Sequence, residues 1–140
     1  MTDAQTDRPR PGLPRRETRP DTEPADADAL ALARQVVDLA ADKKASDIVL
    51  LDIHELTTLA DYFVICSGSS ERQLGAIADG ISEGLRAAGV RPIGREGSSS
   101  AHWLLIDYGA VIVHVMAPPE REFYQLERLW AEAPLLLRVQ

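Results

Sequence analysis

A Gly-Ser turn between an apolar run and a helix-like stretch is the first place in the sequence where chemistry could occur. Residues 67–73 (SGSSERQ) follow the apolar run of residues 62–66. A strand that leads through such a turn into a helix N-terminus often binds phosphate, because the backbone N–H groups and the helix dipole both favour an anion. Nucleotidyltransferases place a Gly-Ser pair at this position. The stretch therefore raises the hypothesis of nucleotidyl transfer.

Nucleotidyl transfer also needs two carboxylates at positions i and i+2 of a strand, which hold Mg²⁺ against the triphosphate. No Asp-x-Asp follows Ser69, and the one pair with that spacing, Asp26 and Asp28, precedes every predicted strand. The turn also lacks the lysine of a phosphate loop. The remaining candidates fall in different predicted elements: Asp52, Asp61 and Asp107. We therefore expect no catalysis, no cofactor and no metal site.

The same turn has a structural explanation as the start of a helix. Ser70 is the expected N-cap, and Gln73 lies at the capping-box spacing from it. Gly68 is expected to supply the backbone freedom for a tight entry. Losing such a cap costs about 1 kcal/mol, so these residue types are explained without a ligand.

The nucleophile and metal-ligand candidates elsewhere do not form a site. Cys66 is the only cysteine, which excludes an intrachain disulfide, and its apolar surroundings predict a buried, structural thiol. The histidines His54, His102 and His114 are dispersed without metal-ligand spacing. His114 is expected to be a satisfied core or edge histidine, with a hairpin carboxylate as a candidate partner.

The charge of the chain limits the classes of partner. The formal net charge is −7, which disfavours DNA and broad phosphate binding and favours a basic protein. No run approaches the ~18 apolar residues of a membrane span, so we expect a soluble, cytoplasmic protein with no membrane partner.

Residues 1–25 carry five of the nine prolines and no aromatic residue, which predicts a disordered tail. Because this tail contains five arginines, a minor, direct contact with RNA remains an alternative. The seven carboxylates within residues 1–28 favour a solvated tail instead. The arginines are Arg8, Arg10, Arg15, Arg16 and Arg19.

The rest of the chain predicts an α/β domain with a mixed sheet flanked by helices. Helices are expected over residues 26–44, 70–88 and 120–133, and strands over 48–53, 62–66, 91–96, 103–106 and 111–116. The last two strands flank a short turn containing Gly109, which indicates an antiparallel hairpin. The second of them is apolar on both faces, as a central strand would be. The predicted domain covers residues 26–134, and residues 135–140 form a C-terminal extension.

Five of the seven aromatic residues fall between Trp103 and Trp130. Phe123 and Trp130 share the apolar stripe of the predicted last helix, whereas Tyr108 occupies a hairpin turn where packing is not expected. Trp, Tyr and Arg dominate binding hot spots. The candidates for a partner-binding patch are therefore Trp103, Tyr108, Arg121 and Tyr124; the alternative is that these side chains are buried in the core.

Three stretches of the chain resemble the ribosomal silencing factor family, also called Iojap-like proteins. They are residues 43–81, 103–116 and 121–130, and they carry ADYFV at 60–64, a W…DYG hairpin with His114, and REFYQLERLW at the end. These motifs occur together and in order. The resemblance runs from about residue 28 to residue 133.

The resemblance implies a nucleotidyltransferase-like fold without catalytic carboxylates and a translational repressor rather than an enzyme. It implies binding to the large ribosomal subunit through ribosomal protein L-fourteen, which blocks joining with the small subunit when nutrients are short. Homodimers are also implied. The expected interface residues are Trp103, Asp107, Tyr108, His114, Arg121 and Tyr124, with Asp61 behind them; the alternative places several of them in the core or a dimer contact. An assembly factor that touches ribosomal RNA, and a nucleotide-binding protein, are the alternative functions.

Overall fold

A six-stranded mixed sheet forms the centre of the part of the chain that the computed structural model describes, residues 23–140, with side chains from residue 28. The strand order is β3-β4-β5-β2-β1-β6. The bounds are β1 (Ser46–Asp52), β2 (Tyr62–Ser67), β3 (Gly94–Ser98), β4 (Trp103–Asp107), β5 (Val111–Met116) and β6 (Leu135–Val139). Strands β2 and β5 pair in parallel, and the other neighbours pair antiparallel. The predicted mixed α/β fold is confirmed.

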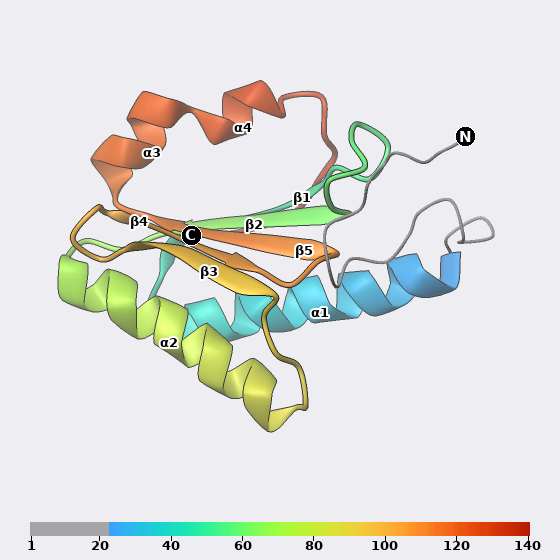
Figure 1. Ribbon diagram of the computed structural model, residues 1–140. Helices are drawn as coiled ribbons and strands as arrows, with labels where there is room; N and C mark the ends of the chain where they lie inside the picture. The colour runs from blue at the N-terminus through green and yellow to red at the C-terminus, as the bar shows by residue number, and fades with distance from the viewer. Residues whose placement is uncertain (1–22) are drawn as a thin grey trace.

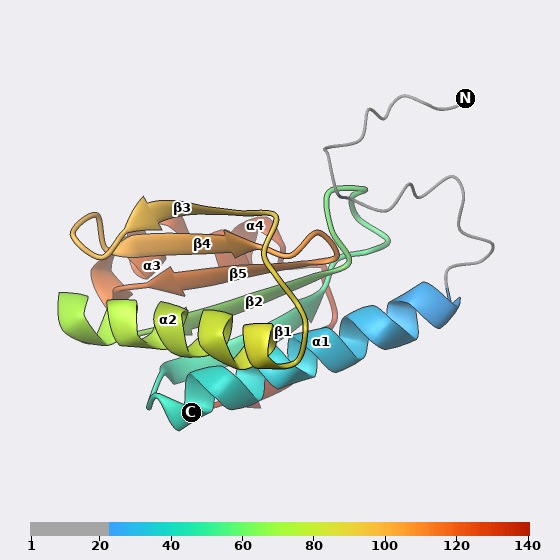
Figure 2. The ribbon, with the colours of Figure 1, turned by 60° about the horizontal axis from the view of Figure 1, so that its bottom comes forward.

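Two long helices, α1 (Glu23–Asp42) and α2 (Glu71–Ala87), cover one face of the sheet (Figure 1). Figure 2 shows them side by side beneath the strands. In α2, the side chains at three- and four-residue spacing are all buried: Leu74, Ile77, Ala78, Ile81 and Leu85. The larger of two apolar clusters lies here, between these helices and the sheet.

Two short helices, α3 (Pro118–Tyr124) and α4 (Leu126–Leu129), cover the opposite face (Figure 1). Leu126 and Trp130 pack there against a smaller buried cluster that includes Phe63, Ile65 and Ile112. Every residue of β2 and of β5 is buried because both faces of the sheet are covered. The prediction that the strand over residues 111–116 is central is therefore confirmed.

The helices that follow the parallel strands β2 and β5 lie on opposite faces of the sheet. Ser67 at the end of β2 pairs in register with Met116 at the end of β5. The chain then turns from β2 into α2 on one face and from β5 into α3 on the other (Figure 1). In open α/β sheets the carboxyl ends of strands at such a switch form the usual ligand-binding crevice.

The C-terminal half differs from its predicted form in three places. Residues 135–139 are not a bare extension but form β6, which pairs antiparallel with β1. The single helix expected over 120–133 is broken at Gln125, which has left-handed angles of φ 52 and ψ 50. The edge strand expected over 91–96 lies at Gly94–Ser98, so Gly97 and Ser98 belong to β3 and not to the following loop.

The N-terminal boundary lies close to its predicted position. Helix α1 begins at Glu23, three residues before the expected start at residue 26. The remainder of the predicted disordered tail, residues 1–22, lies outside the described residues. Between residues 23 and 140, no helix has the length and apolar character needed to cross a membrane.

Candidate partner-binding surface

Helices α3 and α4 expose three large apolar side chains to solvent. Phe123 is 79% exposed, Leu129 74% and Tyr124 49%. Beside them, Leu56 of the β1–β2 loop, Leu129 and Trp130 line a groove of about 370 Å³, with Arg128, Ala131 and Glu132 at its border. We call Phe123, Tyr124 and Leu129 the α3–α4 patch. Its aromatic and leucine side chains are of the kind that anchor protein interfaces.

A continuous set of ring contacts connects this patch to the sheet. Phe123 meets Tyr124 at a centroid distance of 5.0 Å, and Tyr124 meets Trp103 at 4.7 Å. The indole Nε1 of Trp103 donates a hydrogen bond of 3.2 Å to Nδ1 of His114 on the central strand β5. The ring of His114 also contacts Phe63 edge-on at 4.9 Å. The exposed Tyr124 therefore packs against Trp103, which is hydrogen-bonded to His114 on the central strand β5.

His114 is buried, and its partner is an indole rather than the expected hairpin carboxylate. Burial lowers the pKa of His114 to about 4, so the imidazole is neutral at pH 7. Because Nδ1 accepts the bond from Trp103, the neutral ring carries its proton on Nε2. The expectation of a core histidine is confirmed, but the ring is only half satisfied, because Nε2 is buried without a hydrogen-bond partner among the described residues. The expectation of a carboxylate partner is wrong, since the neighbouring rings leave an apolar pocket around it.

Arg121 fastens α3 to the carboxyl end of β2 and to α4. Its Nη1 donates to Oγ of Ser67 at 2.8 Å, and its Nε and Nη2 donate to the two carboxylate oxygens of Glu127 at 3.0 and 2.9 Å. Oδ2 of Asp47 lies 3.9 Å from Nη2. These bonds lower the pKa of Glu127 below its usual range. Arg121, whose side chain is only 7% exposed, is thus balanced by carboxylates of its own chain.

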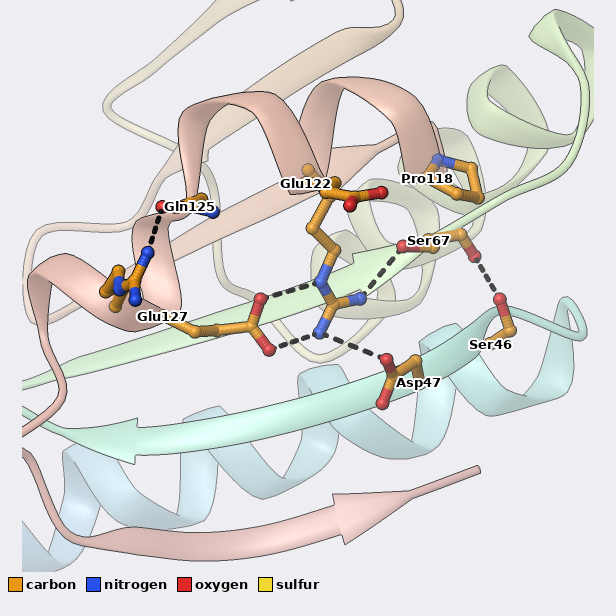
Figure 3. A pocket seen from close by; sticks show the side chains of 9 residues that line it. Ser46, Asp47, Ser67, Pro118, Glu122, Gln125 and Glu127 are labelled. Atoms are coloured by element: carbon orange, nitrogen blue, oxygen red, sulfur yellow. Dashed lines mark hydrogen bonds and ion pairs between the residues drawn. The ribbon is translucent and has the colours of Figure 1, made fainter.

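A polar cavity of about 530 Å³ opens beside Arg121, at the switch between β2 and β5. Figure 3 shows its side chains coming from β1, the end of β2, and the two short helices. Within residues 23–140 no group of three His, Cys, Asp or Glu side chains is placed to hold a metal ion. The site anchors the two short helices through ion pairs, since the carboxylates of Asp47 and Glu127 at its border both face Arg121.

A comparison with family models identifies the family to which the chain belongs. The model described as "Ribosomal silencing factor during starvation" matches residues 26–139. The chain belongs to the ribosomal silencing factor family.

Its relatives in the family cover most of the described chain. Ribosomal silencing factor RsfS of Bacillus subtilis is 45% identical over 94 residues, 67% of this chain and 80% of the relative. RsfS of Halalkalibacterium halodurans is 43% identical over 105 residues, 75% of this chain and 87% of the relative. A crystal structure of a Chromobacterium violaceum protein superimposes with a TM-score of 0.71 at 37% identity, covering 74% of this chain and 86% of that one.

The Gly-Ser turn of this ribosomal silencing factor family member starts a helix, as predicted, with one change in its bonding. Ser70 is the N-cap, and its Oγ accepts from the backbone N–H of Gln73 at 3.0 Å. The Oε1 of Gln73 reaches Ser69, at 2.7 Å from its backbone N, and not Ser70 as a capping box requires. Its Nε2 donates to the carbonyl of Lys44, in the turn that follows α1, at 2.9 Å. The turn therefore connects two helices.

Gly68 is required for space rather than for backbone freedom. Its φ is not among the left-handed values, which occur at Gly89, Gly97 and Gly109. A Cβ at residue 68 would lie 3.1 Å from both Ile77 Cδ1 and Leu74 Cδ2 of α2. The close approach of the turn to α2 accounts for the glycine.

Five of the seven expected interface residues are buried: Asp61, Asp107, Tyr108, His114 and Arg121. Asp107 accepts a bond of 2.8 Å from the backbone N–H of Gly109 and so shapes the hairpin turn. Tyr108 belongs to the core on the α1–α2 face, and burial raises the pKa of its phenol. The expectation that Tyr108 does not pack is wrong, because its side chain belongs to the buried apolar cluster between the sheet and helices α1 and α2.

Two of the seven, Trp103 and Tyr124, reach the surface layer, where their rings are in contact at an interplanar angle of 49°. Sequence reasoning missed Phe123, which was assigned to the core stripe, and Leu129. The adjacent Phe123 and Tyr124 contained a signal, since neighbouring residues on a helix cannot both face the same core. Their role as interface residues remains a prediction.

Proposed function

We propose that this chain is a cytoplasmic translational repressor that binds the large ribosomal subunit and prevents its joining with the small subunit. Membership of the ribosomal silencing factor family carries the proposal. The bacterial relatives are named ribosomal silencing factors, and the mouse relative, 34% identical over 98 residues, is named for assembly of the ribosomal large subunit. This function requires a contact surface and no chemical reaction.

The α3–α4 patch is the proposed contact surface, with ribosomal protein L-fourteen as the partner. Phe123 and Leu129 are the most exposed large apolar side chains among the described residues. The net charge of −7 favours encounter with a basic partner, as ribosomal proteins commonly are. A folded domain of this size has a radius of gyration of ~13 Å, and an interface of ~800 Å² per partner is ordinary. Occupancy of a subunit-joining face by such a body is enough to block joining.

A subunit-joining assay on sucrose gradients tests the proposal. The wild type should co-sediment with large subunits and lower the joined fraction when small subunits are added. The double variant Phe123→Ser, Leu129→Ser should lose both effects with its urea midpoint nearly unchanged, since the two side chains are exposed. Ile93→Ser is the matched control, because Ile93 is 42% exposed but precedes β3 on the far edge of the sheet. Wild type that neither co-sediments nor lowers joining would refute the proposal.

A role in large-subunit assembly is the second candidate, which the name of the mouse relative supports. The two functions predict different gradients from cells that lack the protein. Loss of an assembly factor should accumulate incomplete large-subunit particles during growth. Loss of a silencing factor should leave large subunits complete and raise the joined fraction during starvation.

We also propose that the free protein forms homodimers. Large exposed apolar side chains are often covered by a second copy, and the α3–α4 patch offers such a surface. Sedimentation velocity on the wild type and on the Phe123→Ser, Leu129→Ser variant tests this. A dimer that persists in the variant would place the dimer contact elsewhere on the chain.

A further inference from the structure

One histidine outside the aromatic contacts connects three elements through its ring and its backbone. His102 lies in the β3–β4 loop with a left-handed φ of 65. Its Nδ1 is 3.1 Å from Oε2 of Glu120 in the first turn of α3, and its Nε2 is 3.2 Å from Oε2 of Glu71, the first residue of α2. Its carbonyl also accepts a bond of 3.0 Å from the backbone N–H of Ala117, the N-cap of α3.

The two contacts of the ring are compatible with only one protonation state of the imidazole. A neutral imidazole has a single N–H, so one of its nitrogens would turn a lone pair toward a carboxylate. The imidazolium has two N–H groups and can donate to Glu71 and Glu120 at once. In addition, Oε1 of Glu120 is buried and accepts no hydrogen bond from the described residues. The charge of this carboxylate is therefore balanced chiefly by His102.

We propose that His102, Glu71 and Glu120 form a proton-dependent clamp that holds the N-terminal end of α3 and thereby regulates the α3–α4 patch. The proposal rests on the proposed function of that patch and adds a control to it. It deepens the assignment of the surface by naming a titratable group that holds the start of α3.

The clamp adjoins Trp103, which supports the α3–α4 patch, and Tyr124, which belongs to it. Trp103 follows His102 directly, and Tyr124 lies one turn after Glu120 on α3. The rings of Trp103 and Tyr124 are in contact at 4.7 Å. A shift of the loop or of the start of α3 therefore changes the contact on which the exposed aromatic residues rest.

The direction of the pH effect follows from the neighbours of the ring. The hydrogen bonds to Glu120 and then Glu71 raise the pKa of His102 above 6.5. These are the titratable groups that face it from α3 and α2; the cavity beside it is otherwise lined by Ser69, Ser70, Leu74, Ala117, Pro118 and Pro119. Because the folded pKa is raised, the clamp is closed below about pH 6.5 and opens as the pH rises through the higher folded value. The side chain is 39% exposed, so protons reach it from solvent.

An NMR titration of the histidine C2–H resonances tests the clamp without any ribosome. We expect a pKa for His102 above 6.5 that falls in both Glu71→Gln and Glu120→Gln. Pro118 and Pro119 have no backbone N–H, so hydrogen exchange is followed at the amides of Ala117 and Arg121, which bond to His102 and to Ala117. Their exchange, corrected for intrinsic rates, should increase several-fold above that pKa. A pKa at or below 6.5, or one that neither substitution moves, would overturn the clamp.

The affinity for large subunits between pH 6.5 and pH 8.5 tests the regulation. The wild type should bind several-fold more weakly at pH 8.5, while His102→Asn, which tolerates the left-handed backbone, should be weak and flat across the range. His54→Asn is the matched control that removes another histidine and should retain the wild-type profile. Equal profiles for the wild type and His102→Asn would overturn the regulation. A clamp that titrates as expected in a protein that binds no subunits at any pH would instead refute the proposed function.

Discussion

Arg121 and Glu127 form a two-point ion pair across the break between α3 and α4. Nε and Nη2 of the arginine lie 3.0 and 2.9 Å from the two carboxylate oxygens. The helices on either side have only seven and four residues, too few to be stable alone in water. The pair joins them and, through Ser67, fixes them to the end of β2. The exposed α3–α4 patch depends on this anchor for its position.

The two partners of this pair should differ in their effect on stability. Glu127→Ala leaves the charged Arg121 side chain, which is only 7% exposed, without its main counter-ion, and we expect a loss of about 3 kcal/mol. Arg121→Met removes the buried charge and keeps an apolar side chain of similar length. The Glu127 that remains is 34% exposed and can turn to water, so the loss should be about 1 kcal/mol. Urea unfolding measures both, and equal losses would contradict the asymmetry.

Gly97 should be intolerant of any side chain because of its position in the edge strand β3. Its φ is 82, and a Cβ there would collide with the backbone carbonyl oxygen of Trp103 on β4. Gly97→Ala should therefore cost about 2 kcal/mol or more, through strain and a disturbed β3–β4 ladder. Gly94→Ala is the control, since a Cβ at residue 94 meets nothing within 4 Å. Thermal unfolding should show a lower midpoint in the first variant and an unchanged or higher one in the second.

Cys66 should react with thiol reagents only when the protein unfolds. Burial raises the pKa of the thiol to about 12, so at pH 8 roughly one molecule in ten thousand carries a thiolate. Labelling by a disulfide reagent should be slow in buffer and should accelerate with urea in parallel with global unfolding. Rapid, urea-independent labelling of the native protein would show that strand β2 opens locally.

Local signals in the sequence were sufficient where short-range contacts decide the structure. The start of α2 at Ser70 followed from N-cap chemistry. Its end came within one residue of the expected position, and Gly89 closes it: its N–H bonds to Arg86 while that of Val90 bonds to Leu85, as in a Schellman motif. The central position of β5 followed from its apolar residues on both faces. In each case, the residues that make the contact are close in the chain.

Features set by distant partners were not predictable in the same way. Strand β6 exists because Leu135 pairs with Leu51 and Leu137 pairs with Leu50, far back in the chain. The break at Gln125 places Trp130 against Phe63 at 5.4 Å, a contact between β2 and the end of the second short helix. The same break turns Phe123 out to solvent. The candidate surface was therefore only half recognised from the sequence, because tertiary packing decides which aromatic side chain is exposed.

The buried His114 should make the protein less stable in mild acid. Its folded pKa of about 4 lies below the unfolded value of 6.5, so the unfolded chain binds the proton more readily. Stability should therefore fall as the pH drops below 6.5 and level off near 4. The pKa difference corresponds to about 3 kcal/mol in full and to about 2 kcal/mol at pH 5. The raised pKa of His102 changes the stability in the opposite direction, and Glu127 also titrates in acid. The contribution of His114 must therefore be measured as the difference between the wild type and a variant that lacks this histidine.

His114→Gln provides that difference, because its amide oxygen can still accept the N–H of Trp103 but does not titrate. The free energy of unfolding in urea should be measured for both proteins at pH 7.5 and pH 5. Between these conditions the wild type should lose about 2 kcal/mol more than the variant. If both lose the same amount, the imidazole takes up its proton in the folded state, and the pocket formed by Phe63 and Trp103 must then admit water to the ring.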